Sequence, residues 1–238
     1  MTADRNRALL IVGAMLALAL VAGGWLLGDG LRRARLADRS VTLRGLAERN
    51  VTADLATWTI AYSQQGTELG PVQAAIDADT RRISDFFRAQ GFGASEISTA
   101  GVRVNQFFDS NRGQNNVTVR RRLQLRTGEV MKARAAFARQ FELIRSGVAI
   151  EEGSGITYSF TRLNDVKPAM IAAATRDARA GAEQFARDSG TEVGGIKSAT
   201  QGYFSVGARD GEGEDGGSGS DSPFKKVRVV TTIDFYLD

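Results

Sequence analysis

The stretch KKVRVVTTIDFYL, residues 225–237, alternates apolar and polar side chains along its length. Because successive side chains of a β-strand point to opposite faces of a sheet, this alternation predicts a strand with one buried and one solvated face. An antiparallel sheet that is covered on one side produces this pattern. The predicted strand spans residues 224–237, and its buried face would hold Val227, Val229, Thr231, Ile233, Phe235 and Leu237.

Helix-like and strand-like segments precede this strand in a mixed order. Residues 69–90, 127–144 and 164–189 carry apolar side chains at helical spacing and predict three helices. The order ββαββαβαββ lacks the regular βαβ alternation of a doubly wound sheet, so it predicts an α+β fold. We expect a mainly antiparallel sheet with the three helices on one side. The predicted strands are residues 41–46, 50–66, 96–109, 117–126, 147–160, 192–206 and 224–237.

Two local features concern the first two strands. The sequence GLAERN, residues 45–50, resembles a turn between them. Apolar residues then change parity within the second segment, which indicates a β-bulge or a strand covered on both faces. Val51, Ala53 and Leu55 share one face, and Trp58, Ile60 and Tyr62 share the other.

Residues 8–28, ALLIVGAMLALALVAGGWLLG, include no charged side chain. As a helix this run is roughly 31 Å long, close to the thickness of a bilayer's hydrocarbon core, so it predicts a transmembrane helix. The run continues beyond Ala17-Leu18-Ala19, a motif that signal peptidase could cleave. We therefore expect a retained signal anchor within residues 1–39, followed by one folded domain of residues 40–238.

The charges that flank this helix give conflicting signals about sidedness. Arg5 and Arg7 precede it, and a larger group of arginines follows it. The positive-inside rule would keep the body in the cytoplasm, but long domains can cross a membrane despite flanking charge. The flanking residues alone leave both orientations open. The following arginines are Arg32, Arg33, Arg35 and Arg39.

The composition excludes several kinds of chemistry. The 238 residues include no Cys and no His. Disulfides, thiol nucleophiles, zinc–thiolate sites and Ser-His-Asp catalysis are therefore impossible. Any enzyme built on this chain would use carboxylate, Lys, Tyr, Ser or Thr groups. The formal net charge of +4 is modest for a chain of this length and is weak evidence for nucleic acid.

The sequence TRLNDVKPAMI, residues 161–171, concentrates polar side chains where a strand gives way to a helix. Asn164 fits a helix N-cap, Asp165 favours the positive end of the helix dipole, and Pro168 is tolerated in a first turn. We interpret the cluster as the start of a helix. The alternative is an active site that uses Lys167 and Asp165.

The sequence VTVRRRLQLR, residues 117–126, places Arg120, Arg122 and Arg126 on one face of a predicted strand. No aromatic residue is interleaved to stack on bases, so we expect no nucleic acid partner. We expect a solvated face or an interface with acidic partners. Contact with anionic lipid is the functional alternative, together with Arg32, Arg33 and Arg35 near the anchor.

Residues 207–223 form a Gly/Ser-rich acidic insert. Its carboxylates are hard oxygen ligands of the kind that calcium prefers. The EF-hand pattern fails because Asp215 stands where the turn glycine is required. The motif GGSGSD matches the start of the calcium-binding nonapeptide repeat, but it occurs once, whereas sites of that kind need stacked copies. We expect a flexible loop without a metal. The acidic residues are Asp210, Glu212, Glu214, Asp215 and Asp221.

Two further motifs are weak. Glu151 and Glu152 are adjacent, so an extended strand would point them to opposite faces. In that arrangement they could not easily form a general acid/base pair. Gly153 and Gly155 lack the third glycine of a dinucleotide fingerprint. We therefore expect no cofactor.

Several stretches, in order from residue 41 to residue 237, resemble the SIMPL-domain family of bacterial envelope proteins. The resemblance implies an α+β domain that is exported to the periplasm or cell surface and is often associated with oxidative-stress protection. Some relatives assemble into large rings, and the resemblance brings no catalytic residues. The stretches are VTLRGLAERNVTADLATW (41–58), YSFTRLNDVKPAMIAAATRDARAGAEQFARDSG (158–190), GGIKSATQGYFSV (194–206) and KKVRVVTTIDFYL (225–237).

Residue patterns and resemblance together lead to one expectation. We expect a non-enzymatic, single-pass protein of the bacterial inner membrane, held in the bilayer by residues 8–28, with its body in the periplasm. It would act by forming a homo-oligomer or by binding a protein partner. The alternatives are an envelope hydrolase that uses carboxylate or Lys groups, and a cytoplasm-facing scaffold that binds anionic lipid.

Overall fold

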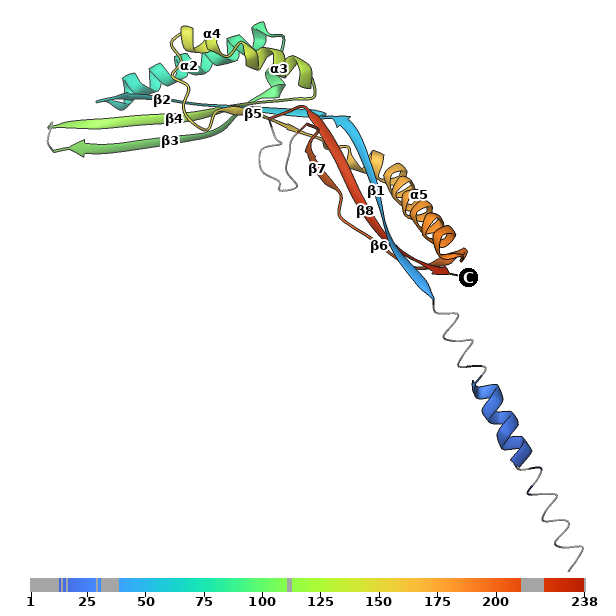
Figure 1. Ribbon diagram of the computed structural model, residues 1–238. Coiled ribbons are helices and arrows are strands. Elements are labelled where there is room, and N and C mark those ends of the chain that lie inside the picture. The colour runs from blue at the N-terminus through green and yellow to red at the C-terminus, as the bar shows by residue number, and fades with distance from the viewer. Residues whose placement is uncertain are drawn as a thin grey trace, which may run out of the picture. The chain divides into compact units, whose positions relative to one another are not determined.

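The computed structural model describes residues 13, 15, 17–28, 30, 39–110, 113–210 and 221–237. Its element order is that of the prediction, ββαββαβαββ, when the neighbouring pairs α3–α4 and β6–β7 are each taken together (Figure 1). The α+β class and the antiparallel pairing are confirmed. The elements are β1 (Ser40–Thr52), β2 (Leu55–Gly66), α2 (Leu69–Ala89), η1 (Ala94–Glu96), β3 (Ile97–Asp109), β4 (Gln114–Thr127), α3 (Val130–Ala138), α4 (Phe141–Arg145), β5 (Gly155–Ser159), α5 (Leu163–Ser189), β6 (Val193–Gln201), β7 (Ser205–Ala208) and β8 (Phe224–Leu237).

The chain separates into two compact units. The central unit consists of Glu48–Pro168 and Phe204–Arg228, and the terminal unit consists of Met1–Ala47, Ala169–Tyr203 and Val229–Asp238. The strands form two four-stranded sheets rather than the one sheet we expected. Local patterns predict which segments become strands, but the partner of each strand depends on contacts between segments far apart in the sequence.

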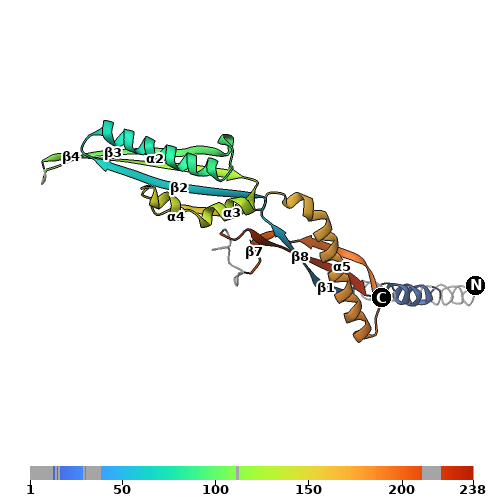
Figure 2. The same ribbon diagram turned by 90° about the horizontal axis from the view of Figure 1, so that it is seen from above.

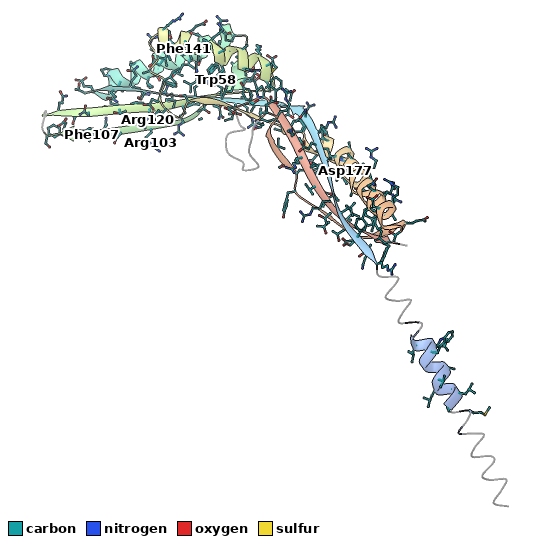
Figure 3. All side chains as sticks on the ribbon, viewed as in Figure 1. Trp58, Arg103, Phe107, Arg120, Phe141 and Asp177 are labelled. Carbon is teal, nitrogen blue, oxygen red and sulfur yellow. The ribbon has the colours of Figure 1, made fainter. Side chains whose placement is uncertain are left out.

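The central unit is built on an antiparallel sheet of order β3-β4-β2-β5. Helices α2, α3 and α4 lie on one side of this sheet (Figure 1). Trp58 of β2 lies between sheet and helices, with its ring centroid 5.1 Å from that of Phe87 and 5.2 Å from that of Phe137 (Figure 3). The apolar face predicted for β4 is buried in this core. Its residues are Val117, Val119, Leu123 and Leu125.

The terminal unit contains strands in the order β1-β8-β6, and α5 packs on them. Ala178 and Ala182 of α5 form a buried cluster with Ile233 and Phe235 of β8. Small side chains let the helix approach the strands closely. The alternation predicted for β8 is confirmed for Val227, Val229, Thr231, Ile233 and Phe235, which are all buried, whereas Leu237 at the end of the strand is half-buried.

Strand β1 continues through the predicted turn GLAERN, so that prediction is wrong. Gly45 serves a close contact with α5 instead. A Cβ at this position would lie 1.8 Å from the carbonyl oxygen of Ala174, a distance no side chain can occupy. The change of parity near Ala53 has a simple cause, because β1 ends at Thr52 and a new strand begins at Leu55.

The predicted helix over residues 127–144 is divided into α3 and α4. The backbone leaves helical geometry at Arg139 (φ −95°, ψ 6°), and its N–H donates to the carbonyl of Ala136, three residues back. The break rotates the buried face of the following turn. Leu143 is therefore buried, whereas Phe141, within the predicted helix, is 64% exposed (Figure 3).

Two predicted strands are also shorter than expected, each because of a glycine. The strand of residues 147–160 is reduced to β5, since the chain turns at Gly153, which has φ +86°. The strand of residues 192–206 is divided into β6 and β7 at Gly202. The Gly202 N–H donates to Val230, and a Cβ there would lie 2.7 Å from the same carbonyl oxygen.

Helix α5 begins at Leu163, so the prediction of Asn164 as its N-cap is wrong. The backbone N–H groups of Thr161 and Arg162 donate to the two carboxylate oxygens of Asp54, at 2.7 and 3.1 Å. Asp54 lies in the turn between β1 and β2. The chain before α5 is thus held by a side chain from more than a hundred residues earlier.

The predicted transmembrane run of residues 8–28 falls partly outside the described residues, since 8–12, 14 and 16 are not among them. Residues 17–28 are helical. Within the part of the chain that the structure describes, no helix combines the length and the apolar character needed to cross a membrane.

Candidate functional site

Strand β3 forms an exposed edge of the sheet in the central unit. It has 13 residues, and among the described residues it pairs with β4 alone. The pairing shifts between Thr99 and Gly101 and is regular from Gly101 to Asp109. Figure 2 shows the β3–β4 hairpin extending past the end of α2. We call residues 101–109 the β3 edge.

The β3 edge carries large apolar side chains that are open to solvent. Val102 and Val104 are 55% and 48% exposed, and Phe107 and Phe108 are 54% and 61% exposed. Val104 lies opposite Val119, which is buried under the helices, so Val102, Val104 and Phe108 face the helix side of the sheet. Phe107 faces the other side.

The opposite side of the same sheet is rich in arginine. Arg120, Arg122 and Arg126 of β4 are exposed on the face away from the helices, as their spacing predicts. Arg103 of β3 lies directly opposite Arg120 and joins them (Figure 3). We call these four residues the arginine face.

One carboxylate is placed among these arginines. Arg120 Nε donates to Glu151 Oε2 at 2.5 Å, and the hydroxyl of Ser63 donates to the other carboxylate oxygen. Burial raises the pKa of Glu151, but the hydrogen bonds from Ser63 and Arg120 and the charge of Arg120 outweigh it and lower the pKa below its usual range. The Glu151 carboxylate is therefore ionised, and it is paired with Arg120.

Two shallow hollows lie on the arginine face. One, of about 350 Å³, is lined by Ala61, Arg120, Arg122, Glu151 and Glu152. Our expectation that the two glutamates point to opposite faces of a strand is wrong, because they precede β5 in a turn and line this hollow together. The other, of about 100 Å³, is lined by Gly101, Val102, Arg103, Arg120 and Arg122.

The charges of the arginine face are incompletely balanced. Arg103, Arg122 and Arg126 form no ion pair with any described residue. Like charges directly opposite one another on neighbouring strands, such as Arg103 and Arg120, destabilise a sheet. Guanidinium groups in this arrangement can bind carboxylate or phosphate through paired N–H donors.

The cluster TRLNDVKPAMI belongs to the start of α5. Asp165 lies in the first turn as predicted, and its N–H donates to the carbonyl of Arg162. Pro168 is the sixth residue of α5, inside the helix rather than in its first turn. Lys167 Nζ lies 5.8 Å from the ring centroid of Phe204, a cation–π distance. These contacts are structural ones.

Most of the remaining predicted residues lie outside the described part of the chain. Arg32, Arg33 and Arg35 lie outside the described residues, as does the part of the acidic insert from 211 to 220. At the start of the insert, Arg209 pairs with Asp210 at 3.0 Å. The described residues include no group of three or more side chains that could hold a metal ion.

Sequence reasoning missed the β3 edge and Arg103. The segment GVRVNQFFD reads as an ordinary strand, and only its position at the edge of the sheet exposes the apolar residues. The alternation of Val102, Arg103 and Val104 could have placed Arg103 on the same face as Arg120 if the pairing of the two strands had been known.

The fold and this surface define an α+β domain whose distinctive feature is an exposed sheet edge beside a basic face. A family model named SIMPL and described as "Protein of unknown function (DUF541)" matches residues 41–235. The chain belongs to the SIMPL family, and the resemblance seen in the sequence is confirmed. A search of curated proteins found no match.

Proposed function

We propose that this chain is a non-enzymatic, membrane-anchored protein of the bacterial cell envelope that acts by self-assembly or by binding a protein partner. The observation that carries the proposal is the β3 edge, which presents unpaired backbone groups and four exposed apolar side chains. An open edge strand is a template for pairing with another strand.

Several other strand edges of the described chain carry features that the β3 edge, residues 101–109, lacks. Strand β6 is interrupted by two register shifts, and β5 has five residues. In the terminal unit, Asp177 of α5 accepts a hydrogen bond from the backbone N–H of Leu46 in β1 (Figure 3). Bulges, shortness and covering groups all discourage edge pairing. The β3 edge has one charged side chain, Arg103, before its final residue.

Membrane anchoring is supported by the uncharged run of residues 8–28. Placement of the body in the periplasm, and a role in envelope or oxidative-stress protection, are supported by the family resemblance. The anchor would hold many copies in one plane, which raises their effective concentration for association.

The test is made with the full-length protein. Membrane fractionation and protease treatment of spheroplasts should place the protein in the membrane with its body accessible from outside. Mass photometry in detergent should show oligomers at micromolar concentration. A soluble protein, a body protected from protease or a strictly monomeric species that binds no protein partner would each contradict part of the proposal.

A second candidate function is the binding of anionic lipid, which the unpaired cations of the arginine face favour. In this case the double variant Arg122→Gln/Arg126→Gln should lose most of its binding to phosphatidylglycerol vesicles at low salt. Neutral phosphatidylcholine vesicles and the variant Arg139→Gln, on the helix side of the sheet, are the controls. Equal binding by the wild type and the double variant would exclude this function for the arginine face.

A further inference from the structure

The β3 edge is self-complementary in a way that defines how two copies of this chain would meet. The regular part of β3 runs from Gly101, just after the register shift, to Asp109, where the strand ends. When two antiparallel copies of a segment overlap completely, its middle residue lies opposite itself. For residues 101–109 that residue is Asn105.

We infer that two copies pair through their β3 edges, antiparallel and about a two-fold axis that passes beside Asn105. The inference rests on the proposed self-assembly and specifies its contact. An axis perpendicular to the sheet keeps the arginine faces of both copies on one side and their helices on the other. This contact is isologous, as in most protein dimers.

The pairs that this register creates are chemically favourable on both faces. On the helix side, Val102 of one copy would lie opposite Phe108 of the other. On the arginine face, Arg103 would lie opposite Phe107, which places a guanidinium beside an aromatic ring. Aromatic and β-branched cross-strand pairs stabilise antiparallel sheets.

The registers centred on Arg103 and on Gln106 are less favourable. An axis beside Arg103 would place two guanidinium groups opposite each other, which is destabilising. An axis beside Gln106 would shorten the regular overlap to residues 103–109. Full overlap of nine residues extends over about 30 Å and forms about eight to ten backbone hydrogen bonds.

The absence of cysteine makes a direct test possible, because each introduced thiol is the only one in the chain. The variants are Asn105→Cys, Gln106→Cys and Ser98→Cys, each in the full-length protein in detergent. Residues directly opposite in an antiparallel pair have Cα atoms about 4.5–5.5 Å apart, within the range that a disulfide spans. The Gln106 positions would be separated by about 8 Å in the inferred register, beyond that range.

After mild oxidation we expect a disulfide-linked dimer as the main product of Asn105→Cys, and at least fivefold less from Gln106→Cys and Ser98→Cys. Arg103→Cys and Phe107→Cys should form a mixed disulfide when the two proteins are combined. Mass photometry under reducing conditions shows whether each variant still assembles as the wild type does.

The outcomes separate this inference from the proposed function. Stronger linkage at residue 106 than at residue 105, or equal linkage at all three sites, would overturn the inferred register. An oligomeric wild type with no linkage at residue 105 would overturn the β3 contact and leave self-assembly in place. A monomeric wild type would overturn both.

Discussion

Arg121 Nη1 donates hydrogen bonds to Asp77 Oδ1 at 2.8 Å and to Thr80 Oγ1 at 2.7 Å. Arg121 is the middle member of the Arg120-Arg121-Arg122 run, so its side chain points to the face opposite to its neighbours and lies under α2. Its side chain is 12% exposed. Three consecutive arginines therefore serve two purposes, because the middle one fastens α2 to the sheet.

Replacement of Asp77 by Ala should lower the free energy of unfolding by about 1 kcal/mol, because it leaves a mostly buried guanidinium without its carboxylate. Asp85→Ala on the same helix is the matched control. Asp85 pairs with Arg88 at 2.9 Å, but both side chains are mainly exposed, so its loss should cost less than about 0.5 kcal/mol. Urea unfolding followed by circular dichroism measures both. Equal effects would contradict the anchoring role of Arg121.

Asp54→Ala should lower stability by about 1–2 kcal/mol at pH 7, because the N–H groups of Thr161 and Arg162 lose their acceptor. Burial raises the pKa of Asp54, but the hydrogen bonds from Thr161 and Arg162 outweigh it and lower the pKa. A carboxylate with a lowered folded-state pKa stabilises the fold above its unfolded pKa of about 4, and this contribution is lost as the pH falls through the folded value.

The difference between wild type and Asp54→Ala should therefore shrink as the pH is lowered from 5 to 2. The control is Asp165→Ala, which removes an exposed carboxylate from the first turn of α5 and should cost about 0.5 kcal/mol. A difference for Asp54→Ala that stays constant over this pH range would mean that the carboxylate does not act as the acceptor.

Gly45→Ala should destabilise the terminal unit by about 2–3 kcal/mol, because the new methyl group would collide with backbone atoms of Ala174 and Ala178. Gly181→Ala in α5 is the opposite case. Its Cβ would meet Leu43 Cδ1 at 3.4 Å, an ordinary contact, and the helix gains about 0.5–1 kcal/mol when alanine replaces glycine. Thermal unfolding should rank the proteins Gly181→Ala, wild type, Gly45→Ala from most to least stable.

Arg103→Gln should raise stability by about 0.2–0.5 kcal/mol at low salt, because it removes a like charge directly opposite Arg120. The gain should fall as ionic strength increases. Arg126→Gln lies on the same face but opposite Thr57, and should change stability by less. If Arg103→Gln stabilises the monomer and also weakens assembly, then Arg103 favours association at the expense of monomer stability.

The sequence predicts where the helices and strands lie better than it predicts which elements pack against one another. The alternation of apolar and polar residues in β8 and in β4 reflects which side chains face the core. The apolar face of each strand is buried, as expected. The apolar stripe predicted for the helix of residues 69–90 is confirmed at Val72, Ile76, Ile83 and Phe87, whereas Leu69 at its start is exposed. Burial of one face imposes a local periodicity of apolar residues, and this periodicity can be read directly from the sequence.

The predictions that fail depend on distant partners. Gly45 resembles a turn residue until α5 is packed against it. Asn164 resembles a cap, but α5 begins one residue earlier, after a segment that Asp54 holds from another part of the chain. The candidate site follows the same rule. Spacing placed Arg120, Arg122 and Arg126 on one face, but the exposure of Val102, Val104 and Phe108 arises only because β3 has no neighbour on its outer side within the described chain.

The pairing of β1 with β8 sets the order of events during biosynthesis. Thr42 donates to Asp234 across 192 positions of the chain, and β8 lies between β1 and β6. The sheet of the terminal unit therefore cannot close until β8 has left the ribosome, whereas all strands of the β3-β4-β2-β5 sheet are complete by Ser159. The nascent chain must carry β1 without this partner until β8 has been synthesised, so a holdase chaperone has a defined strand to protect.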